Sequence, residues 1–328
     1  MTMPLVRVEG LSQHFPVRGG GFRPFQPKRV VYAVDGVDLS IGRGEVVGLI
    51  GESGSGKTTL GRTMLQLYPP TGGQIYFEGN DVTGAHGDRL RMLRRRMQMI
   101  FQNPYSAVNR RKRLGDIIAE PLRIHGIGDV RSRSERTREL LELVGLPVAF
   151  ASRYPHEVSG GQLQRVGIAR ALALEPDFIV ADEPTASLDV SIRAQVINLL
   201  ADLRTRLGLT LVFISHDLSI VSYLCERVAV MYLGKLVEVG PKTDIEQQPL
   251  HPYTRALLSA IPRPDPRQRR SRSTPLGEIP SAVQRPSGCH YHPRCPLAMP
   301  ICTAEYPALE LKAPDRWVAC HAVPPMEA

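Results

Sequence analysis

The chain has 328 residues and a formal net charge of +9, with a hydrophobic fraction of 42% and a charged fraction of 22%. These values are typical of a globular protein and allow one large α/β domain with a smaller appendage. No apolar run approaches the roughly 18 residues needed to cross a bilayer, and the N-terminus lacks a secretory pattern, so we expect a cytoplasmic protein that reaches a membrane only through a partner.

The positive charge is concentrated in arginine-rich runs. A basic balance of this kind can serve nucleic acid, an anionic membrane surface or phosphate ligands. None of the runs carries the interleaved aromatic residues that stack on bases, which favours solvated helix faces and loops. The runs lie at residues 89–96, 110–113, 131–138 and 263–272.

Strand patterns open the chain. Residues 5–11 and 34–41 carry apolar residues at strand spacing, and a glycine- and proline-rich insertion separates them at residues 19–27. Residues 45–51 form a short apolar run that ends in glycine, as expected of a buried parallel strand. We expect a helix to follow from Lys57.

Helix and strand patterns alternate through the middle of the chain. Residues 86–150 are rich in helix signals, and residues 178–181 and 209–214 are apolar runs with a helical pattern between them. This alternation predicts an α/β fold with a parallel sheet and right-handed crossovers. From about Pro249 prolines become frequent, which predicts an extended arm and then a small cysteine-bearing module at about residues 287–321.

The strongest motif is Gly51-Glu-Ser-Gly-Ser-Gly-Lys57-Thr58, which matches G-x-x-x-x-G-K-[ST] between a predicted strand and a predicted helix. The glycines let the backbone turn tightly, so that successive N–H groups face phosphate oxygens. Lys57 places a charge on the β- and γ-phosphates, and the Thr58 hydroxyl can ligate Mg²⁺. The sequence therefore predicts a site for a nucleoside triphosphate.

Two carboxylates end the apolar run at residues 178–181. Asp182 can hold Mg²⁺ directly or through water, and Glu183 can polarise the attacking water as a general base. An acidic pair at a strand end is often only solvated. Its occurrence together with the phosphate loop favours a hydrolytic site.

Residues Val158-Ser-Gly-Gly-Gln162 resemble the signature motif of ABC ATPases, usually written LSGGQ, with valine in the leucine position. The pentapeptide opens a helical pattern, and a helix N-terminus with an open backbone is an anion site. A glycine turn that merely caps a helix would look the same in isolation. Its position about twenty residues before the acidic strand favours the signature motif.

The resemblance to ABC ATPases extends to the remaining motifs in family order. It implies that Gln102 is the Q-loop glutamine, which contacts Mg²⁺ and the water and responds to the transmembrane partner, and that His216 is the switch histidine that reaches the γ-phosphate. Glu183, His216 and Gln102 are the implied catalytic set, with Mg²⁺ on Thr58, Gln102 and Asp182. The implied ATP contacts are Gly51, Ser53, Gly54, Ser55, Gly56, Lys57, Thr58, Thr59, Gln102, Asp182, Ser159, Gly160, Gly161, Gln162 and Asp189, the last in the D-loop.

An aromatic ring is expected to stack on adenine. Phe15 aligns best with the family's aromatic position, and Tyr32 is the competitor because it directly precedes Ala33-Val-Asp-Gly36. Either ring would offer a π face to the base.

The resemblance implies a P-loop NTPase fold of the ABC ATPase type over residues 1–248. It would comprise a mostly parallel sheet core, an antiparallel N-terminal β subdomain and a helical subdomain at about residues 86–172, followed by an irregular C-terminal extension at residues 249–328. It also implies a head-to-tail dimer, in which each ATP lies between the phosphate loop of one subunit and the signature motif of the other.

Several stretches resemble the dipeptide/oligopeptide permease branch, among them residues 101–109, 115–122, 154–157, 251–257 and 288–296. Arg110-Arg-Lys112 departs from the proline-containing stretch of that branch. This resemblance implies peptide import with a second, homologous ATPase subunit in a heterodimer, two transmembrane permease subunits and a periplasmic or extracellular substrate-binding protein. The chain would then work at the cytoplasmic face of the membrane; its cargo is not encoded in the ATPase subunit.

Four cysteines lie near the C-terminus, in a module too small for a core of its own, which indicates a metal staple rather than disulfides in a reducing cytoplasm. Thiolate ligation fits Zn²⁺ or an iron–sulfur cluster, and unliganded thiols are the third alternative. The permease resemblance implies a [4Fe–4S] cluster. Its ligands would be Cys289, Cys295, Cys302 and Cys320, with His290, His292 and His321 as possible substitutes.

Two other functions are compatible with the sequence. A non-transport ABC ATPase acting on nucleic acid would explain the basic charge, but the single cassette and the permease-like C-terminus favour transport, and no nucleic-acid partner is expected. A redox-sensing role centred on the cysteine module is the other.

Overall fold

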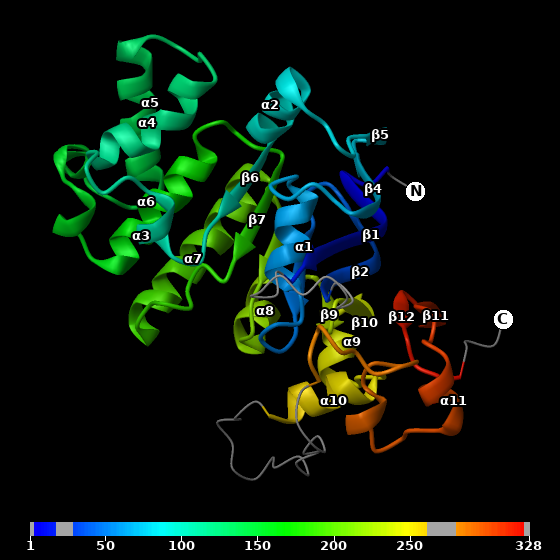
Figure 1. The fold of residues 1–328 in the computed structure, drawn as a ribbon. Helices are drawn as coiled ribbons and strands as arrows, with labels where there is room; N and C mark the ends of the chain where they lie inside the picture. The colour runs from blue at the N-terminus through cyan, green and yellow to red at the C-terminus, as the bar shows by residue number, and fades with distance from the viewer. Residues whose placement is uncertain (1–2, 18–28, 261–279, 325–328) are drawn as a thin grey trace. The chain divides into compact units, whose positions relative to one another are not determined.

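The computed structural model describes residues 3–17, 29–260 and 280–324. The insertion at residues 19–27 and the basic run at residues 263–272 therefore lie outside the described residues. Two compact units are present (Figure 1): unit 1 comprises Met1–Gly42, Val46–Gly84 and Ile214–Ala328, and unit 2 comprises Arg43–Glu45 and Ala85–Phe213. Within the described ranges, no helix combines the length and the apolar character that a membrane span requires.

An antiparallel sheet forms the N-terminal part of unit 1. Its strands are β1 (Val6–Pro16), β2 (Val30–Ile41), β4 (Gly72–Phe77) and β5 (Asn80–Asp81), in the order β2-β1-β4-β5. Apolar side chains at alternate positions of β1 and β2 are buried, because successive side chains of a strand point to opposite faces. The expected antiparallel N-terminal subdomain is present.

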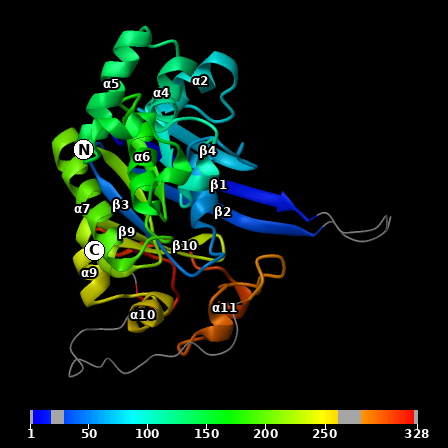
Figure 2. The ribbon, with the colours of Figure 1, turned by 90° about the vertical axis from the view of Figure 1, so that its left-hand side faces the viewer.

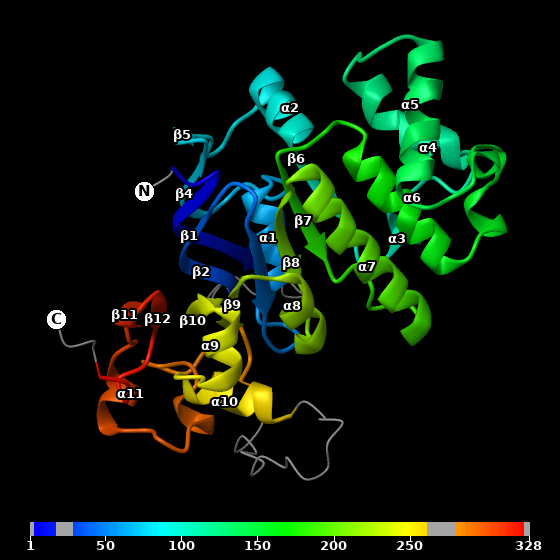
Figure 3. The same ribbon diagram turned by 180° about the vertical axis from the view of Figure 1, so that it is seen from behind.

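A second group of strands in unit 1 holds the phosphate loop. Strand β3 (Val46–Ile50) is buried at every residue and pairs in parallel with β9 (Arg227–Tyr232), which continues antiparallel to β10 (Lys235–Pro241). Unit 1 also contains the helices α1 (Lys57–Met64), α8 (Leu218–Leu224), α9 (Lys242–Gln247), α10 (Pro252–Ser259) and α11 (Pro300–Ala304). Figure 3 shows α10, in yellow, beside α9.

The C-terminal extension is joined to this sheet by a short hairpin. Strand β12 (Arg316–Val318) pairs antiparallel with β10 and with β11 (Glu310–Ala313). A fully buried ion pair ties the hairpin down, because Arg316 Nη2 donates to Glu238 Oε1 at 2.6 Å. The same carboxylate accepts the backbone N–H groups of Leu250 and His251. The extension is therefore part of unit 1 rather than a separate body.

Unit 2 contains the strands that lead to Gln102 and to the acidic pair Asp182–Glu183. Strand β6 (Met97–Ile100) is parallel to β7 (Phe178–Asp182), and β8 (Thr210–Ile214) lies on the other side of β7. Around them are α2 (Gly87–Arg96), α3 (Pro104–Ala107), α4 (Leu114–Ile124), α5 (Val130–Leu143), α6 (Gly160–Leu172) and α7 (Val190–Leu207), with 3₁₀ turns η1 (Val148–Ser152) and η2 (Pro155–Glu157). Helices α4, α5 and α6 pack together (Figure 2). The parallel pairs of both units confirm the predicted α/β fold class.

Candidate nucleotide-binding site

The phosphate loop connects the end of β3 to the start of α1. Gly51 has φ 152° and Gly56 has φ 107°. Residues that carry a Cβ rarely adopt this region of backbone conformation. A Cβ at Gly51 would lie 2.2 Å from the Met231 carbonyl oxygen, and one at Gly56 would lie 2.0 Å from that of Ala33. Helix α1 begins directly after Gly56 with no side-chain N-cap hydrogen bond, and the N-terminus of a helix favours anions such as phosphate. This glycine cradle fits a triphosphate.

The Lys57 side chain points back toward the phosphate loop that precedes it. Its side chain is buried, and Nζ donates to the carbonyl oxygens of Gly51 and Glu52, each at 2.8 Å, and to Ser55 Oγ at 3.3 Å. These contacts hold the ammonium within the loop. Ser53 and Gly54 are exposed at its tip.

His216 lies in the same unit as the phosphate loop. The backbone N–H of Ser215 donates to the Leu49 carbonyl oxygen at 3.2 Å. This hydrogen bond fixes the segment after β8 beside the C-terminal end of strand β3. The His216 side chain is exposed. Its position next to the phosphate-binding strand is consistent with contact to a γ-phosphate.

The acidic pair and the Q-loop glutamine come together in unit 2. Because β6 and β7 are parallel neighbours with Ile100 opposite Ala181, their carboxyl ends lie at the same edge. Gln102 Nε2 donates to Glu183 Oε2 at 2.9 Å. Asp182 is 1% exposed at the end of β7, and Glu183 has φ 44°, in the left-handed region.

The signature segment forms the N-terminus of α6. Ser159 is exposed and caps the helix reciprocally with Gln162: Ser159 Oγ accepts the Gln162 N–H, and Gln162 Oε1 accepts the Ser159 N–H at 3.0 Å. Gly161 faces α7 so closely that a Cβ would lie 2.2 Å from Ile192 Cγ2. Asp189 is exposed at the N-cap of α7.

The two aromatic candidates differ in what covers them. The Arg285 guanidinium lies 4.0 Å from the Tyr32 ring centroid, and His14 meets the same ring edge-on. Arg285 is itself fixed by Asp35, since Nη1 donates to Oδ2 at 2.8 Å. Burial alone would raise the pKa of Asp35, but Arg285 and Lys235 hold it well below its ordinary value. Phe15 is half-buried, and among the described residues the Tyr68 ring meets it edge-on.

Comparison with known proteins places this geometry in a family. Residues 34–186 match the family model described as ABC transporter, and residues 237–302 match the model described as oligopeptide/dipeptide transporter, C-terminal region. The chain is 52% identical over 317 residues to a putative peptide import ATP-binding protein of Brucella ovis, with 97% of each chain covered. The chain belongs to the ABC transporter family of ATP-binding proteins.

Other relatives of this ABC ATPase agree. The oligopeptide transport ATP-binding protein AppF of Bacillus subtilis is 49% identical, with 97% of each chain covered. Among solved structures, a dimeric ATP-binding cassette in a post-hydrolysis state bound to ADP and Pi has a TM-score of 0.64 and 30% identity over 72% of this chain and 98% of that one. The predicted family, fold and ATPase activity are thereby confirmed.

The four C-terminal cysteines lie near enough for the charge of one thiolate to shift the pKa of another. Burial, together with the charges of Cys302, Cys320 and Cys295, raises the pKa of Cys289 to about 11. Among the residues that the structure describes, however, no set of three or more His, Cys, Asp and Glu side chains is placed to hold a metal ion. The three neighbouring histidines have contacts elsewhere: His290 with the Tyr306 ring, His292 with the Cys289 carbonyl oxygen and His321 with that of Glu305.

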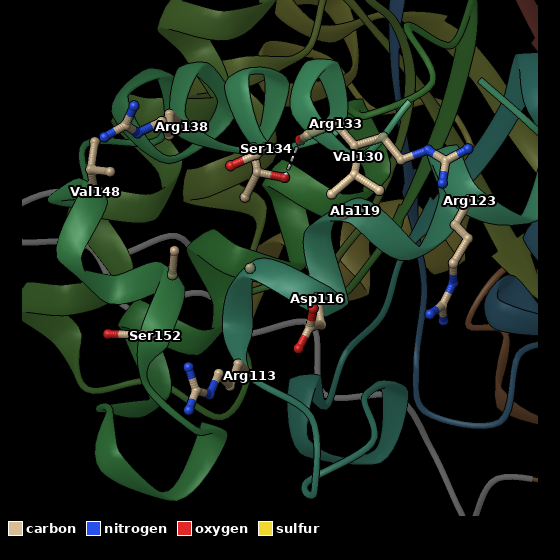
Figure 4. A pocket seen from close by; sticks show the side chains of 13 residues that line it. Arg113, Asp116, Ala119, Arg123, Val130, Arg133, Ser134, Arg138, Val148 and Ser152 are labelled. Carbon is tan, nitrogen blue, oxygen red and sulfur yellow. Dashed lines mark hydrogen bonds between the residues drawn. The ribbon is translucent and has the colours of Figure 1, made fainter. Parts of the chain in front are cut away.

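A pocket of about 530 Å³ opens in unit 2 between α4, α5 and η1 (Figure 4). Four arginines contribute to its lining, and Val130 is 84% exposed at the start of α5. One of the arginines, Arg133, is fixed by a hydrogen bond from Nε to the Ile127 carbonyl oxygen at 2.7 Å. The lining side chains include Arg113, Asp116, Arg123, Val130, Arg133, Ser134, Arg138, Val148 and Ser152.

Proposed function

We propose that this chain binds MgATP and hydrolyses it to drive import of dipeptides or oligopeptides through membrane permease subunits at the cytoplasmic face. The glycine loop between β3 and α1 carries the proposal, because a side chain at Gly51 or Gly56 would collide with the carbonyl oxygen of Met231 or Ala33 and displace the loop. Peptide as the cargo is supported by the names of the relatives and by the match to the oligopeptide/dipeptide transporter C-terminal region.

Each site residue then has a chemical role. Lys57 and the loop amides, among them those of Gly51, Ser53, Gly54, Ser55, Gly56, Thr58 and Thr59, bind the phosphates. Thr58, Asp182 and Gln102 would hold Mg²⁺, which would supply positive charge to neutralise the phosphates. Glu183 accepts a hydrogen bond from the water that attacks the γ-phosphorus, and His216 contacts the γ-phosphate. The products are ADP and inorganic phosphate.

The signature segment acts on the nucleotide of a partner. Ser159, Gly160, Gly161 and Gln162 form the N-terminus of α6, which carries a capping box and has the positive end of the helix dipole that suits the γ-phosphate held by another subunit's phosphate loop. Asp189 begins the neighbouring helix α7 and lies at the same interface. The partner that we propose is a second, homologous ATPase subunit in a heterodimer.

Phe15 is the ring that we propose for adenine. Arg285 already occupies a face of Tyr32, whereas Phe15 has a half-buried ring with a single edge-on aromatic neighbour among the described residues. Phe15→Ala should weaken MgATP binding by about 1–3 kcal/mol, as loss of base stacking does, and Tyr32→Ala should leave it near wild type. The reverse result would assign Tyr32.

The arginine-lined pocket of unit 2 is where we propose that a permease subunit docks, with a substrate-binding protein delivering cargo from the other side. The pocket follows Gln102 in the chain and combines apolar and basic lining, which suits a short cytoplasmic helix of a permease. Arg138→Glu should reduce co-purification of the permease subunits. Arg131→Glu, which reverses a charge on the same helix outside the pocket lining, is the matched control.

For the cysteine module we propose a [4Fe–4S] cluster on Cys289, Cys295, Cys302 and Cys320, with Zn²⁺ as the alternative metal. The four cysteines lie near enough to affect one another's pKa values, and four neighbouring sulfurs are the ligand set that such a cluster would require. Iron, sulfide and zinc should be measured in anaerobically purified protein and in its Cys295→Ser variant. Cys225→Ser, at a buried cysteine outside the module, is the control. If the purified chain contains neither iron nor zinc in stoichiometric amount, both the [4Fe–4S] cluster and the Zn²⁺ site are excluded.

The decisive experiment for ATP hydrolysis is Glu183→Gln. This variant should abolish turnover and retain MgATP, so that a nucleotide-bound dimer accumulates in size-exclusion chromatography. Glu175→Gln, at an exposed glutamate of the same unit, should hydrolyse ATP normally. Near-normal hydrolysis by the Glu183 variant would refute the role of that residue.

A further inference from the structure

Glu52, the second residue of the phosphate loop, is held at three of its polar groups. Its backbone N–H donates to Tyr253 Oη at 2.8 Å, and its carbonyl oxygen accepts from Lys57 Nζ, also at 2.8 Å. Its carboxylate is bound by Arg294, a residue of the C-terminal cysteine module. The phosphate loop is therefore fastened to the C-terminal extension within unit 1.

The contact between Arg294 and Glu52 is a bidentate ion pair. Arg294 Nη1 donates to Glu52 Oε2 at 2.9 Å, and Nη2 donates to Oε1 at 3.1 Å. The Arg294 side chain is 7% exposed and that of Glu52 is 25% exposed. Parallel hydrogen bonds between a guanidinium and a carboxylate fix orientation as well as position. Glu52 is thus held in one arrangement.

Arg294 is itself held on a rigid support. Tyr232, Tyr253 and Tyr291 are almost fully buried and form a cluster with ring centroids 4.6–5.4 Å apart. Nη1 of Arg294 also donates to Tyr232 Oη at 3.4 Å. Tyr253 comes from α10 and Tyr291 from the segment just before Arg294, so the cluster joins the extension to the end of β9.

The local backbone connects Arg294 to the cysteines. Arg294 is the last residue of the 3₁₀ turn His292–Arg294. The His292 N–H donates to the Cys289 carbonyl oxygen, and the Cys295 N–H donates to the His292 carbonyl oxygen. Arg294 therefore lies in a single tight turn between two of the four cysteines.

The charge of Glu52 gives the pair a consequence for phosphate binding. A carboxylate in a loop that receives a triphosphate repels the phosphates unless a cation neutralises it. We propose that Arg294 is a positioning residue of the phosphate loop: it neutralises Glu52 and, through the Glu52 backbone, keeps Lys57 and the loop amides in their phosphate-binding arrangement. Through Arg294, the cysteine module thereby helps to hold the phosphate loop in its nucleotide-binding conformation. This inference rests on the proposed ATP-binding function.

A double-mutant cycle tests the proposal in the full-length chain. Binding of MgATP is measured by calorimetry in the Glu183→Gln background, where hydrolysis does not interfere. Arg294→Gln should raise the Kd about tenfold, since it leaves the Glu52 carboxylate without its cation. Adding Glu52→Gln should restore most of the lost affinity, because the repelling charge is gone. In chains that retain Glu183, the KM for ATP should rise more than kcat falls.

Arg285→Gln is the matched control, because it removes another arginine–carboxylate pair of the same extension, Arg285–Asp35, at a different place. Its Kd for MgATP should stay within about twofold of the parent. The proposal is overturned if Arg294→Gln binds like the parent, if the second substitution fails to restore affinity, or if Arg285→Gln weakens binding equally. Absence of MgATP binding by the parent chain would instead refute the proposed function.

Discussion

Gln102 donates a hydrogen bond from Nε2 to Oε2 of Glu183 at 2.9 Å, across the ends of two parallel strands. Glu183 has φ 44°, a left-handed conformation that costs a non-glycine residue roughly 1–2 kcal/mol and persists only where its surroundings hold it. The glutamine therefore fixes the direction of a carboxylate whose backbone is already strained. A movement of the Q-loop would release that carboxylate, which provides a physical link between a docked permease and the proposed catalytic base.

Removal of this hydrogen bond should slow hydrolysis more than it weakens binding. Gln102→Ala removes the hydrogen bond from Gln102 to Glu183 and a proposed Mg²⁺ contact, so kcat should fall about 10–100-fold. Steady-state phosphate release and calorimetric MgATP binding separate the two effects. Gln98→Ala, at a glutamine of β6 that bonds to the Arg94 carbonyl oxygen, is the control. Unchanged kcat in the Gln102 variant would remove that residue from the mechanism.

The two glycines of the signature segment should respond differently to alanine. A Cβ at Gly161 would lie 2.2 Å from Ile192 Cγ2, whereas one at Gly160 would lie at an ordinary 3.5 Å from Leu188 Cδ2. Gly161→Ala should therefore destabilise the fold by about 1–3 kcal/mol, and Gly160→Ala should cost little or stabilise α6. Urea unfolding measures both. Because Ile192→Ala opens space, it should rescue the Gly161 variant; equal stability of the two alanine variants would contradict this packing.

Local motifs carried most of what could be predicted for the nucleotide site. The phosphate loop is eight consecutive residues and the acidic pair Asp182–Glu183 ends an apolar run, so both could be predicted from local patterns, whereas the role of Gln102 is implied only by the resemblance to ABC ATPases. The Arg294–Glu52 and Arg285–Tyr32 contacts could not, because their partners are more than two hundred residues apart and neither periodicity nor turn chemistry encodes such pairings. The fold places Arg294 of the cysteine module against Glu52 of the phosphate loop.

The buried pair between Arg316 and Glu238 should be essential to the docking of the C-terminal hairpin. Glu238 is fully buried, so Arg316→Met leaves a carboxylate with two backbone donors and no cation. Loss of one partner from such a pair costs about 3–5 kcal/mol. Equilibrium unfolding in urea should show this loss, and Glu238→Gln combined with Arg316→Met should cost less than the sum of the single substitutions. A loss below about 1 kcal/mol would show that the hairpin is held by its apolar contacts instead.

The acid stability of unit 1 should depend on His251. The side chain is 1% exposed, and its Nδ1 accepts the backbone N–H of Tyr253 at the start of α10. Burial lowers the pKa of His251 to about 3, from the 6.5 of an unperturbed histidine. Between these values the unfolded chain binds a proton that the folded chain excludes, so the free energy of unfolding should fall by roughly 1.4 kcal/mol for each pH unit as the pH drops from about 6 towards 3.

Substitution by asparagine isolates this contribution. His251→Asn can still cap α10 through its side-chain oxygen but cannot titrate. We expect the parent to be more stable than this variant at pH 7.5. The difference in their free energies of unfolding, measured in urea from pH 7.5 to 4.5, should shrink as the pH falls, because only the parent loses stability when its unfolded chain binds a proton at His251. His156→Asn, at an exposed histidine of unit 2, is the control. A difference that stays constant over this pH range would mean that the His251 ring takes up its proton within the folded chain, and hence that α10 opens enough to admit water around it.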